Sequence, residues 1–180
     1  MKYKLIGSVA LCAALVANAT SGLTLGPNQV EANFDNEIEC LAKNIYFESA
    51  NQPYAGKIAV GMVTLNRVDS EDFPDTVCDV VYQARMKPSW KTGEPVPIRN
   101  QCQFSWYCDG KPDVPYDTEV WHKSIDIATN LYSIFVDKEY EADDITEGAT
   151  FYHATYVSPR WRHSLTKTVR IEDHIFYKDE

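Results

Sequence analysis

The sequence predicts a helix-dominated α+β domain with a small sheet at its C-terminal end. Two patterns support this prediction. Apolar residues recur every three or four positions in segments 36–50, 53–68 and 117–136, as in helices with one buried face. Segments 149–155 and 167–177 are instead rich in Thr, Val, Ile, Tyr and Phe, which favour strands. A chain of 180 residues is long enough for one domain with a single core.

The first residues have the features of a secretory signal peptide. Two lysines precede an apolar run from Leu5 to Val16, and a small-residue cleavage site of the Ala-x-Ala type ends at Ala19. The run is much shorter than the roughly 20 residues that span a bilayer as a helix, so a retained anchor is the weaker alternative. We therefore expect residues 1–19 to be removed, residues 20–35 to form an irregular tether, and the protein to act in the periplasm or outside the cell.

The predicted helices have recognisable ends. The domain, residues 36–180, begins with an asparagine that can cap the first helix, and this helix ends near Glu48. Pro53 suits the first turn of the second helix. Thr76 and Asp79 have the spacing of a capping box and predict a short third helix.

Residues 83–116 show no periodicity and contain several prolines and two glycines. This composition predicts an irregular surface loop rather than regular structure. Loops of this length are usually either functional or disordered. A disulfide between Cys102 and Cys108 would fix part of this one.

The cysteine count supports export. Cys12 lies within the signal peptide, which leaves Cys40, Cys78, Cys102 and Cys108, an even number, in the mature chain. Three pairings are possible. Cys102 and Cys108 close a short loop, which leaves Cys40 to pair with Cys78. A zinc site is the alternative, but thiolate zinc ligands usually occur as Cys-x-x-Cys pairs, which this sequence lacks.

The charge balance limits the classes of partner. The formal net charge of the chain is −9, and removal of residues 1–19 takes away two lysines and no acid, which gives −11. Nucleic acids and anionic membranes are normally bound by clustered Lys and Arg, so we expect neither as a partner. A sugar polymer is compatible, because hydrogen bonds and aromatic stacking bind it. We expect a monomer with no cofactor and no stable membrane insertion.

Glu48 is the strongest candidate for a catalytic group. It lies where the first helix ends, next to Phe47 and close to Tyr46 and Tyr54. A carboxyl group among aromatic side chains loses solvation when it ionises, so its pKa rises and it can donate a proton near neutral pH. The alternative from periodicity alone is a solvated acid at a helix end.

Short motifs occur in a fixed order along the domain. They are Ile45-Tyr46-Phe47-Glu48, Pro53, Gly56, Ala59-Val60, Asn66-Arg67-Val68, Phe73-Pro74, Thr76-Val77, Val80-Val81-Tyr82, Gln103-Phe104-Ser105, Asp109-Gly110, Thr146, Gly148-Ala149, Phe151-Tyr152, Trp161 and His174-Ile175-Phe176-Tyr177. In this order they resemble the cell wall hydrolases of the spore-cortex-lytic SleB/CwlJ type over nearly the whole domain. The four cysteines resemble the disulfide-bearing branch of that family.

The resemblance implies a lysozyme-like catalytic domain that cuts peptidoglycan glycan strands between N-acetylmuramic acid and N-acetylglucosamine, often as a lytic transglycosylase. It assigns the catalytic glutamate to Glu48. This acid would protonate the glycosidic oxygen, and its carboxylate would then take a proton from the C6 hydroxyl of the muramic acid, which forms a 1,6-anhydro ring. If water attacks instead, the enzyme is a hydrolytic muramidase, and Asp109 is the candidate second acid.

Further side chains are candidates for sugar contacts. Amide or hydroxyl groups that suit sugars and N-acetyl groups are present on Gln103, Ser105 and Tyr152. Flat faces that could stack on sugar rings are present on Phe104, Trp106 and Tyr107. The alternative for the 103–108 group is packing within a disulfide loop.

Three departures from the family pattern bear on function. Gln52 replaces a second glutamate, residues 84–101 are an insertion, and Glu172 replaces glycine. If the acid at position 52 were the essential one, the protein would be a wall-binding protein with a decayed active site.

Histidines and basic residues raise two further hypotheses. His153, His163 and His174 could bind zinc with Glu48 in a metal-dependent amidase, although they lack His-Glu-x-x-His spacing. His174 is otherwise expected to form a buried hydrogen bond. The basic cluster is expected to be either a solvated strand face or a cationic rim that meets wall carboxylates; it comprises Arg160, Arg162, Lys167 and Arg170.

Overall fold

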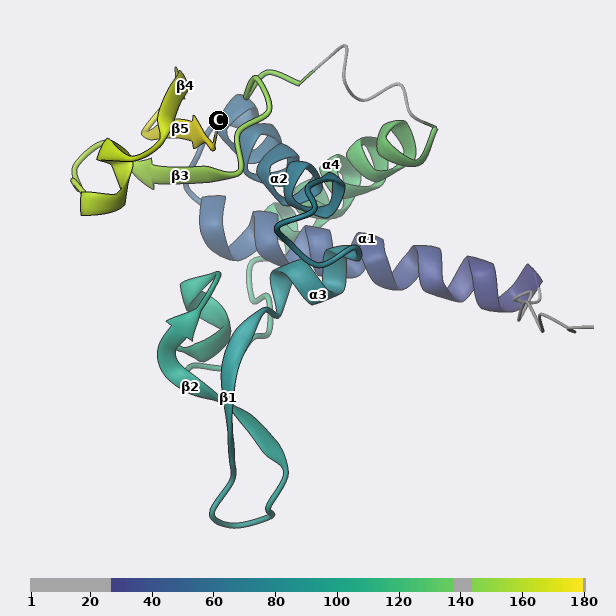
Figure 1. Ribbon diagram of the computed structural model, residues 1–180. Coiled ribbons are helices and arrows are strands. Elements are labelled where there is room, and N and C mark those ends of the chain that lie inside the picture. The colour runs from purple at the N-terminus through teal and green to yellow at the C-terminus, as the bar shows by residue number, and fades with distance from the viewer. Residues whose placement is uncertain (1–26, 138–143, 180) are drawn as a thin grey trace, which may run out of the picture.

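The computed structural model describes residues 27–137 and 144–179 and confirms the predicted α+β class. Figure 1 shows the helices gathered at the centre, with the C-terminal sheet beside α2. The helices are α1 (Pro27–Ser49), α2 (Tyr54–Asp69), α3 (Val77–Val81) and α4 (Thr118–Val136). The predicted signal peptide lies outside the described residues. None of the helices within them is long and apolar enough to cross a bilayer.

The strands form two separate antiparallel sheets. Strands β3 (Phe151–Ala154), β5 (His174–Lys178) and β4 (Thr166–Ile171) lie in that order in the C-terminal sheet, as the β-rich segments predicted. Strands β1 (Ala84–Pro88) and β2 (Pro95–Cys102) form a hairpin. Short 3-10 helices are η1 (Ser105–Cys108) and η3 (Arg160–His163).

Helix α1 begins earlier than the sequence indicated, at Pro27 rather than at residue 36. Residues 27–35, expected to be part of an irregular tether, are therefore helical. The ring of Phe34 packs against Tyr132 of α4 with centroids 5.1 Å apart, so a tertiary contact supports these turns. Most other described side chains of residues 27–35 are exposed, so the sequence of this segment shows no apolar periodicity. Residues 20–26 lie outside the described part of the chain.

The prediction of an irregular loop over residues 83–116 is wrong for the first half of this segment, which forms the β1–β2 hairpin. The prolines of this segment argue against a sheet, because proline has no N–H to donate to a neighbouring strand. Each strand of a two-stranded sheet has a free edge, however, so Pro88, Pro95 and Pro97 can be accommodated. Figure 1 shows the hairpin projecting away from the helices.

The main core lies between the helices, where Leu41, Ala42 and Ile45 of α1 are fully buried. Gly61 allows α2 to approach α1 and α4 closely. A Cβ atom at this position would lie 2.6 Å from Leu131 Cδ1 and 3.1 Å from Ile45 Cδ1. A second, smaller core joins α2 to the C-terminal sheet.

The cap predicted at Thr76 was confirmed, whereas Asn36 lies within α1, which begins at Pro27, and so does not cap it. Thr76 caps α3 by accepting a hydrogen bond from the backbone N–H of Asp79. Asp117 caps α4 by accepting from the amides of Glu119 and Val120. Glu172, at the β4–β5 turn where the family tends to have glycine, has a φ of 49°, in the left-handed region that favours glycine.

The predicted disulfides are both present. Cys40–Cys78 joins α1 to α3 with Cα atoms 5.2 Å apart, and Cys102–Cys108 closes the loop around η1 with Cα atoms 6.1 Å apart. Their sequence separations are 38 and 6 residues. The longer loop removes more freedom from the unfolded chain when it is closed.

The Cys40→Ala/Cys78→Ala variant is therefore expected to lose about 4 kcal/mol of unfolding free energy, and Cys102→Ala/Cys108→Ala about 2 kcal/mol, since closure entropy grows with loop length. Urea unfolding of both variants without reductant measures the difference. A larger loss from the Cys102–Cys108 pair would contradict this ranking.

Candidate functional site

Glu48 lies in the last turn of α1, and buried contacts hold this helix end in place. The Ser49 hydroxyl donates to the carbonyl of Ile45 at 2.5 Å. The ammonium of Lys57, a buried residue, donates to the carbonyl oxygens of Ser49 and Ala50, the latter at 2.8 Å. A cation at a helix C-terminus satisfies carbonyls that have no partner in the helix and favours the helix dipole. The backbone that carries Glu48 is therefore fixed on both sides of it.

The Glu48 carboxyl has a side-chain hydrogen-bond partner from the C-terminal sheet. The Tyr152 hydroxyl, from β3, donates a hydrogen bond to Glu48 Oε2 at 3.0 Å. Burial raises the pKa of Glu48 above its ordinary value, although this hydrogen bond, the charge of Arg67 and the backbone of Ser105 favour the charged form. The carboxyl can thus hold a proton at a higher pH than an exposed glutamate can.

Arg67 is a buried cation beside this pair. It is 5% exposed, and its Nε donates to the Thr150 carbonyl at 2.8 Å. Its guanidinium lies 4.9 Å from the ring centroid of Phe104, and two further rings, Phe73 and Phe151, lie within 6 Å. Burial lowers the pKa of Arg67 to about 10, so it stays charged at neutral pH. It supplies positive charge to the site.

Glu48 opens onto a cavity of about 670 Å³ between the end of α1 and the segment 105–116. This volume is within the usual range of ligand pockets. The residues that line it are Phe47, Glu48, Ser105, Trp106, Asp109, Lys111, Pro112, Asp113, Val114 and Tyr116.

A second carboxylate, Asp109, faces the same cavity. Its Oδ1 accepts from the backbone N–H of Lys111 at 2.8 Å, and its Oδ2 lies 3.4 Å from the Lys111 ammonium. These contacts lower the pKa of Asp109, and the backbone hydrogen bond has the largest effect. Burial raises the pKa of the neighbouring Asp113. The two pKa shifts therefore have opposite directions, so Glu48 keeps its proton to a higher pH than Asp109 does.

Only some of the predicted sugar-contact residues lie at the Glu48 cavity or contact Glu48. Ser105, Trp106 and Asp109 line the cavity, and Tyr152 contacts Glu48, whereas Gln103 and Phe104 do not line it. Phe104 is 3% exposed and its ring packs on the Arg67 guanidinium.

Trp106 is 6% exposed, and its indole N–H donates to Asn44 Oδ1 at 3.0 Å. Its ring stacks on Phe47 and meets Tyr82 edge-on. Tyr107 packs edge-on against Tyr82 as well. The expected flat faces of Phe104 and Trp106 are therefore used inside the protein, which agrees with the packing alternative.

Several residues of this site were not singled out by the sequence. Arg67 carried a usable signal, because it lies four residues after Val63 on the apolar stripe of α2, where a charged residue needs an explanation. Tyr116 carried none, because its place at the site comes from a contact with Tyr46, far away in the sequence. Lys57 and Lys111 contact nearby residues, Ser49 and Asp109, but no motif marks them.

Gln52, which replaces the family's second acid, does not line the Glu48 cavity. Its Nε2 points to Asp173 Oδ2, 3.5 Å away at the β4–β5 turn. A glutamate here would place two carboxylates together, so an amide suits this position.

The histidines and the basic cluster lie elsewhere. His153 uses both ring nitrogens, with the Ala154 carbonyl at 2.9 Å and the Tyr177 hydroxyl at 3.1 Å. The hydrogen bond expected at His174 is not made by its buried Nδ1, and its ring packs edge-on against Tyr152. In residues 27–137 and 144–179, no three His, Cys, Asp or Glu side chains are grouped as metal ligands. None of the four basic residues of η3 and β4 lines the Glu48 cavity.

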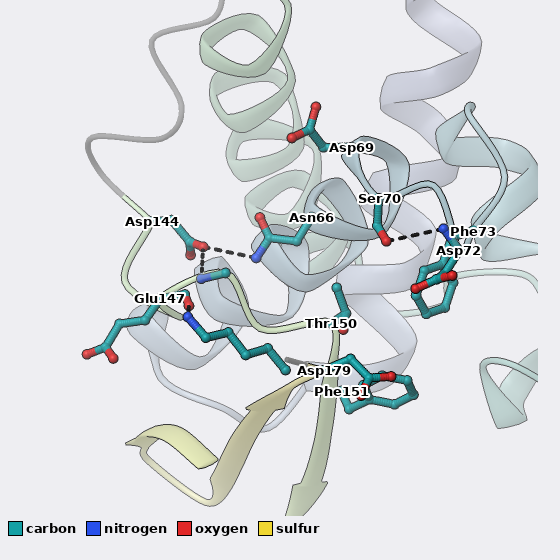
Figure 2. Close-up of a pocket in the computed structure, with 12 residues that line it drawn as sticks. Asn66, Asp69, Ser70, Asp72, Phe73, Asp144, Glu147, Thr150, Phe151 and Asp179 are labelled. Atoms are coloured by element: carbon teal, nitrogen blue, oxygen red, sulfur yellow. Dashed lines mark hydrogen bonds between the residues drawn. The ribbon is translucent and has the colours of Figure 1, made fainter. Parts of the chain in front are cut away.

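A larger cavity of about 760 Å³ lies between α2 and the 144–151 segment (Figure 2). Asn66 donates to Asp144, Thr146 and the Ala149 carbonyl there, at 2.9 to 3.1 Å. Asp144 in turn accepts from the amide of Gly148. These bonds fix a loop. Of these two cavities, we place the site at the one of about 670 Å³, because Glu48 lines it and does not line the other.

Comparison with known families gives one match by sequence. The cell wall hydrolase family matches residues 51–177. This segment begins just after Glu48, so the match covers Arg67, Ser105, Asp109 and Tyr152 but not Glu48 itself.

Curated relatives match part of the chain. A spore cortex-lytic enzyme from Bacillus cereus is 42% identical over 60 residues, which are 33% of this chain and 23% of that enzyme. One from Oceanobacillus iheyensis is 38% identical over 65 residues, which are 36% of this chain and 24% of that enzyme. The matched segment thus spans about a quarter of the length of these relatives.

Solved structures match more of the chain. The catalytic domain of the Bacillus cereus SleB protein is 26% identical with a TM-score of 0.54, over 80% of this chain and 91% of that one. The catalytic domain of the germination-specific lytic transglycosylase SleB from Bacillus anthracis is 27% identical, also with a TM-score of 0.54, over 79% of this chain and 94% of that one.

The raised pKa of Glu48 has a consequence for stability. The folded state binds a proton at Glu48 more tightly than the unfolded state, so unfolding free energy falls as pH rises from the unfolded pKa through the folded one. Glu48→Gln should therefore melt a few degrees higher than the unchanged protein at neutral pH, at about 2–4 °C per kcal/mol. The difference should close well below about pH 4, where both states are protonated. Thermal unfolding across this pH range measures it.

The exposed Glu71→Gln is the matched control and should leave the curve unchanged. An equal or lower melting temperature for Glu48→Gln at neutral pH would show that charge on Glu48 is not disfavoured.

Proposed function

This chain belongs to the cell wall hydrolase family, and from that membership we propose that it cleaves peptidoglycan glycan strands with Glu48 as the acid. The bond proposed is the one between N-acetylmuramic acid and N-acetylglucosamine. The observation that carries the proposal is a half-buried carboxyl with a raised pKa that opens onto a cavity of about 670 Å³. The names of the similar proteins, spore cortex-lytic enzymes and a lytic transglycosylase, support the same reaction class.

The proposed reaction begins with proton donation from Glu48 to the glycosidic oxygen as positive charge develops on the muramic acid ring. Glu48 then becomes a carboxylate. The Tyr152 hydroxyl, 3.0 Å away, and the charge of Arg67 favour this form. They offset part of the cost of a buried charge at the moment when it forms.

The carboxylate then accepts the proton of the C6 hydroxyl of the same sugar, whose oxygen bonds to C1. The products are a 1,6-anhydro end and a free 4-hydroxyl on the leaving sugar, and Glu48 regains its proton. The protein is therefore proposed to be a lytic transglycosylase. One side chain acts in turn as acid and base, so this route requires no second carboxyl group.

The second candidate is a hydrolytic muramidase, which Asp109 specifically favours. Its carboxylate faces the Glu48 cavity and has a lowered pKa, as a base that activates water or a group that stabilises the oxocarbenium requires. In this case, products would carry reducing ends.

We also propose that the protein meets its substrate after export. The signal-like first 19 residues and two disulfides in the folded domain support an oxidising compartment.

Glu48→Gln should reduce the release of soluble fragments from intact sacculi by about 10²- to 10⁴-fold, since it removes the proton donor but keeps the side-chain shape. Mass spectrometry of the fragments identifies the ends, because an anhydro end is one water lighter than a reducing end. Asp109→Asn is the matched acid-to-amide control in the same cavity. It should retain activity in a transglycosylase and lose it in a muramidase. Undiminished release by Glu48→Gln would remove Glu48 from the mechanism.

The pH profile gives a separate test of the Glu48–Tyr152 hydrogen bond. That bond favours the charged carboxyl, so Tyr152→Phe should raise the pKa of Glu48 further. Activity that needs protonated Glu48 should then persist to a higher pH, with the basic limb shifted up by about one unit. Tyr177→Phe, which removes a hydroxyl bonded to His153, should leave the limb in place. A limb that moves to lower pH would reverse the assigned roles.

A further inference from the structure

Tyr116 presents an aromatic ring to solvent at the edge of the Glu48 cavity. The residue is 89% exposed and lines that cavity next to the exposed Val114. A ring this exposed adds little to the core, because rings stabilise a fold through buried area. The ring is therefore free to contact a ligand in the cavity.

The exposed ring is nevertheless held in a defined place. The hydroxyl of Tyr46 accepts hydrogen bonds from the backbone amides of Tyr116 and Asp117 at 3.1 and 3.0 Å. The rings of Tyr46 and Tyr116 meet edge-on with centroids 6.2 Å apart. Tyr46 is 3% exposed and lies on α1 two residues before Glu48. Buried contacts thus fix the position of Tyr116 relative to the Glu48 carboxyl.

Tyr116 also lines a second, smaller cavity of about 290 Å³. Its other lining residues are Tyr46, Ala50, Asn51, Asp117 and Val120. Because Ala50 and Asn51 follow the end of α1 that carries Glu48, the two cavities are neighbours along this helix end. Tyr116 is the residue common to both. A chain-like ligand that fills both cavities has to cross its ring.

We infer that Tyr116 stacks on a sugar ring of the bound strand, beyond the two sugars that flank the cleaved bond. This inference rests on the proposed function. A pyranose ring has a face of C–H bonds that packs on an aromatic ring, while its hydroxyl edges need polar partners. Asn51 offers an amide in the smaller cavity, and none of the described residues that line it is basic, which suits an uncharged sugar. The ring of Tyr116 would fill the role first expected of Phe104 and Trp106, which are buried.

Steady-state kinetics on glycan strands freed of their peptides test this subsite, with the full chain as the enzyme. Tyr116→Ala should raise KM about tenfold, equivalent to ~1.4 kcal/mol of lost binding, with kcat within about twofold. Tyr116→Phe keeps the ring and should retain the original KM. Tyr156→Ala is the matched control, because Tyr156 is 86% exposed and lines neither cavity. Equal KM values for Tyr116→Ala and Tyr156→Ala would overturn the inference.

Binding in an uncleaving background separates this inference from the proposed function. Fluorescently labelled strands are titrated onto Glu48→Gln and onto Glu48→Gln/Tyr116→Ala, and the double variant should bind about tenfold more weakly. Strands of two sugars, which end within the Glu48 cavity, should bind both variants equally. If the unchanged chain cleaves nothing, the proposed function fails while this comparison still measures the subsite. Equal binding of long strands to both variants would overturn the subsite alone. Melting curves of each variant verify that the fold is intact.

Discussion

The burial of α1 against α2, α3 and α4 is the constraint on which the rest of the structure depends. Leu41 and Ile45 are fully buried, the Cys40–Cys78 disulfide ties the helix to α3, and Gly61 lets α2 approach it closely. A helix fixed in this way has a defined end. The Lys57 ammonium donates hydrogen bonds to the carbonyls at that end. Glu48 lies in the last turn of the helix and lines the cavity.

The chemistry of Glu48 follows from opposing influences on a single carboxyl group. Burial favours its neutral form, and Tyr152, Arg67 and the backbone of Ser105 favour its charged form. Burial has the larger effect, so the pKa is raised. These partners come from β3, α2 and η1, which are far apart in the sequence. The role proposed for Glu48, to donate a proton and then accept one, needs this balance, because either form alone would be too stable to react.

Aromatic side chains have two separate tasks around this site. Phe104, Phe73 and Phe151 enclose the Arg67 guanidinium, and Trp106 stacks on Phe47 in the wall of the cavity. These rings hold the charged groups in place. Exposed rings such as Tyr116 remain for a ligand. Burial, and not residue type, therefore decides which aromatic groups can contact a sugar strand.

The sequence by itself determined the helices from α2 onward, the C-terminal strands, the disulfide pairing and the candidate at Glu48. The first three depend on residues close together in the chain, on apolar period, or on a count of cysteines, whereas the candidate at Glu48 depends on the resemblance to a known family. The first turns of α1 and the β1–β2 hairpin required contacts that local pattern does not contain, namely Phe34 on Tyr132 and strand pairing across prolines. Only the tertiary structure decided which side chains surround Glu48. It buried Phe104, turned Gln52 toward Asp173 and placed Tyr116 beside the cavity, because packing between distant segments sets side-chain exposure.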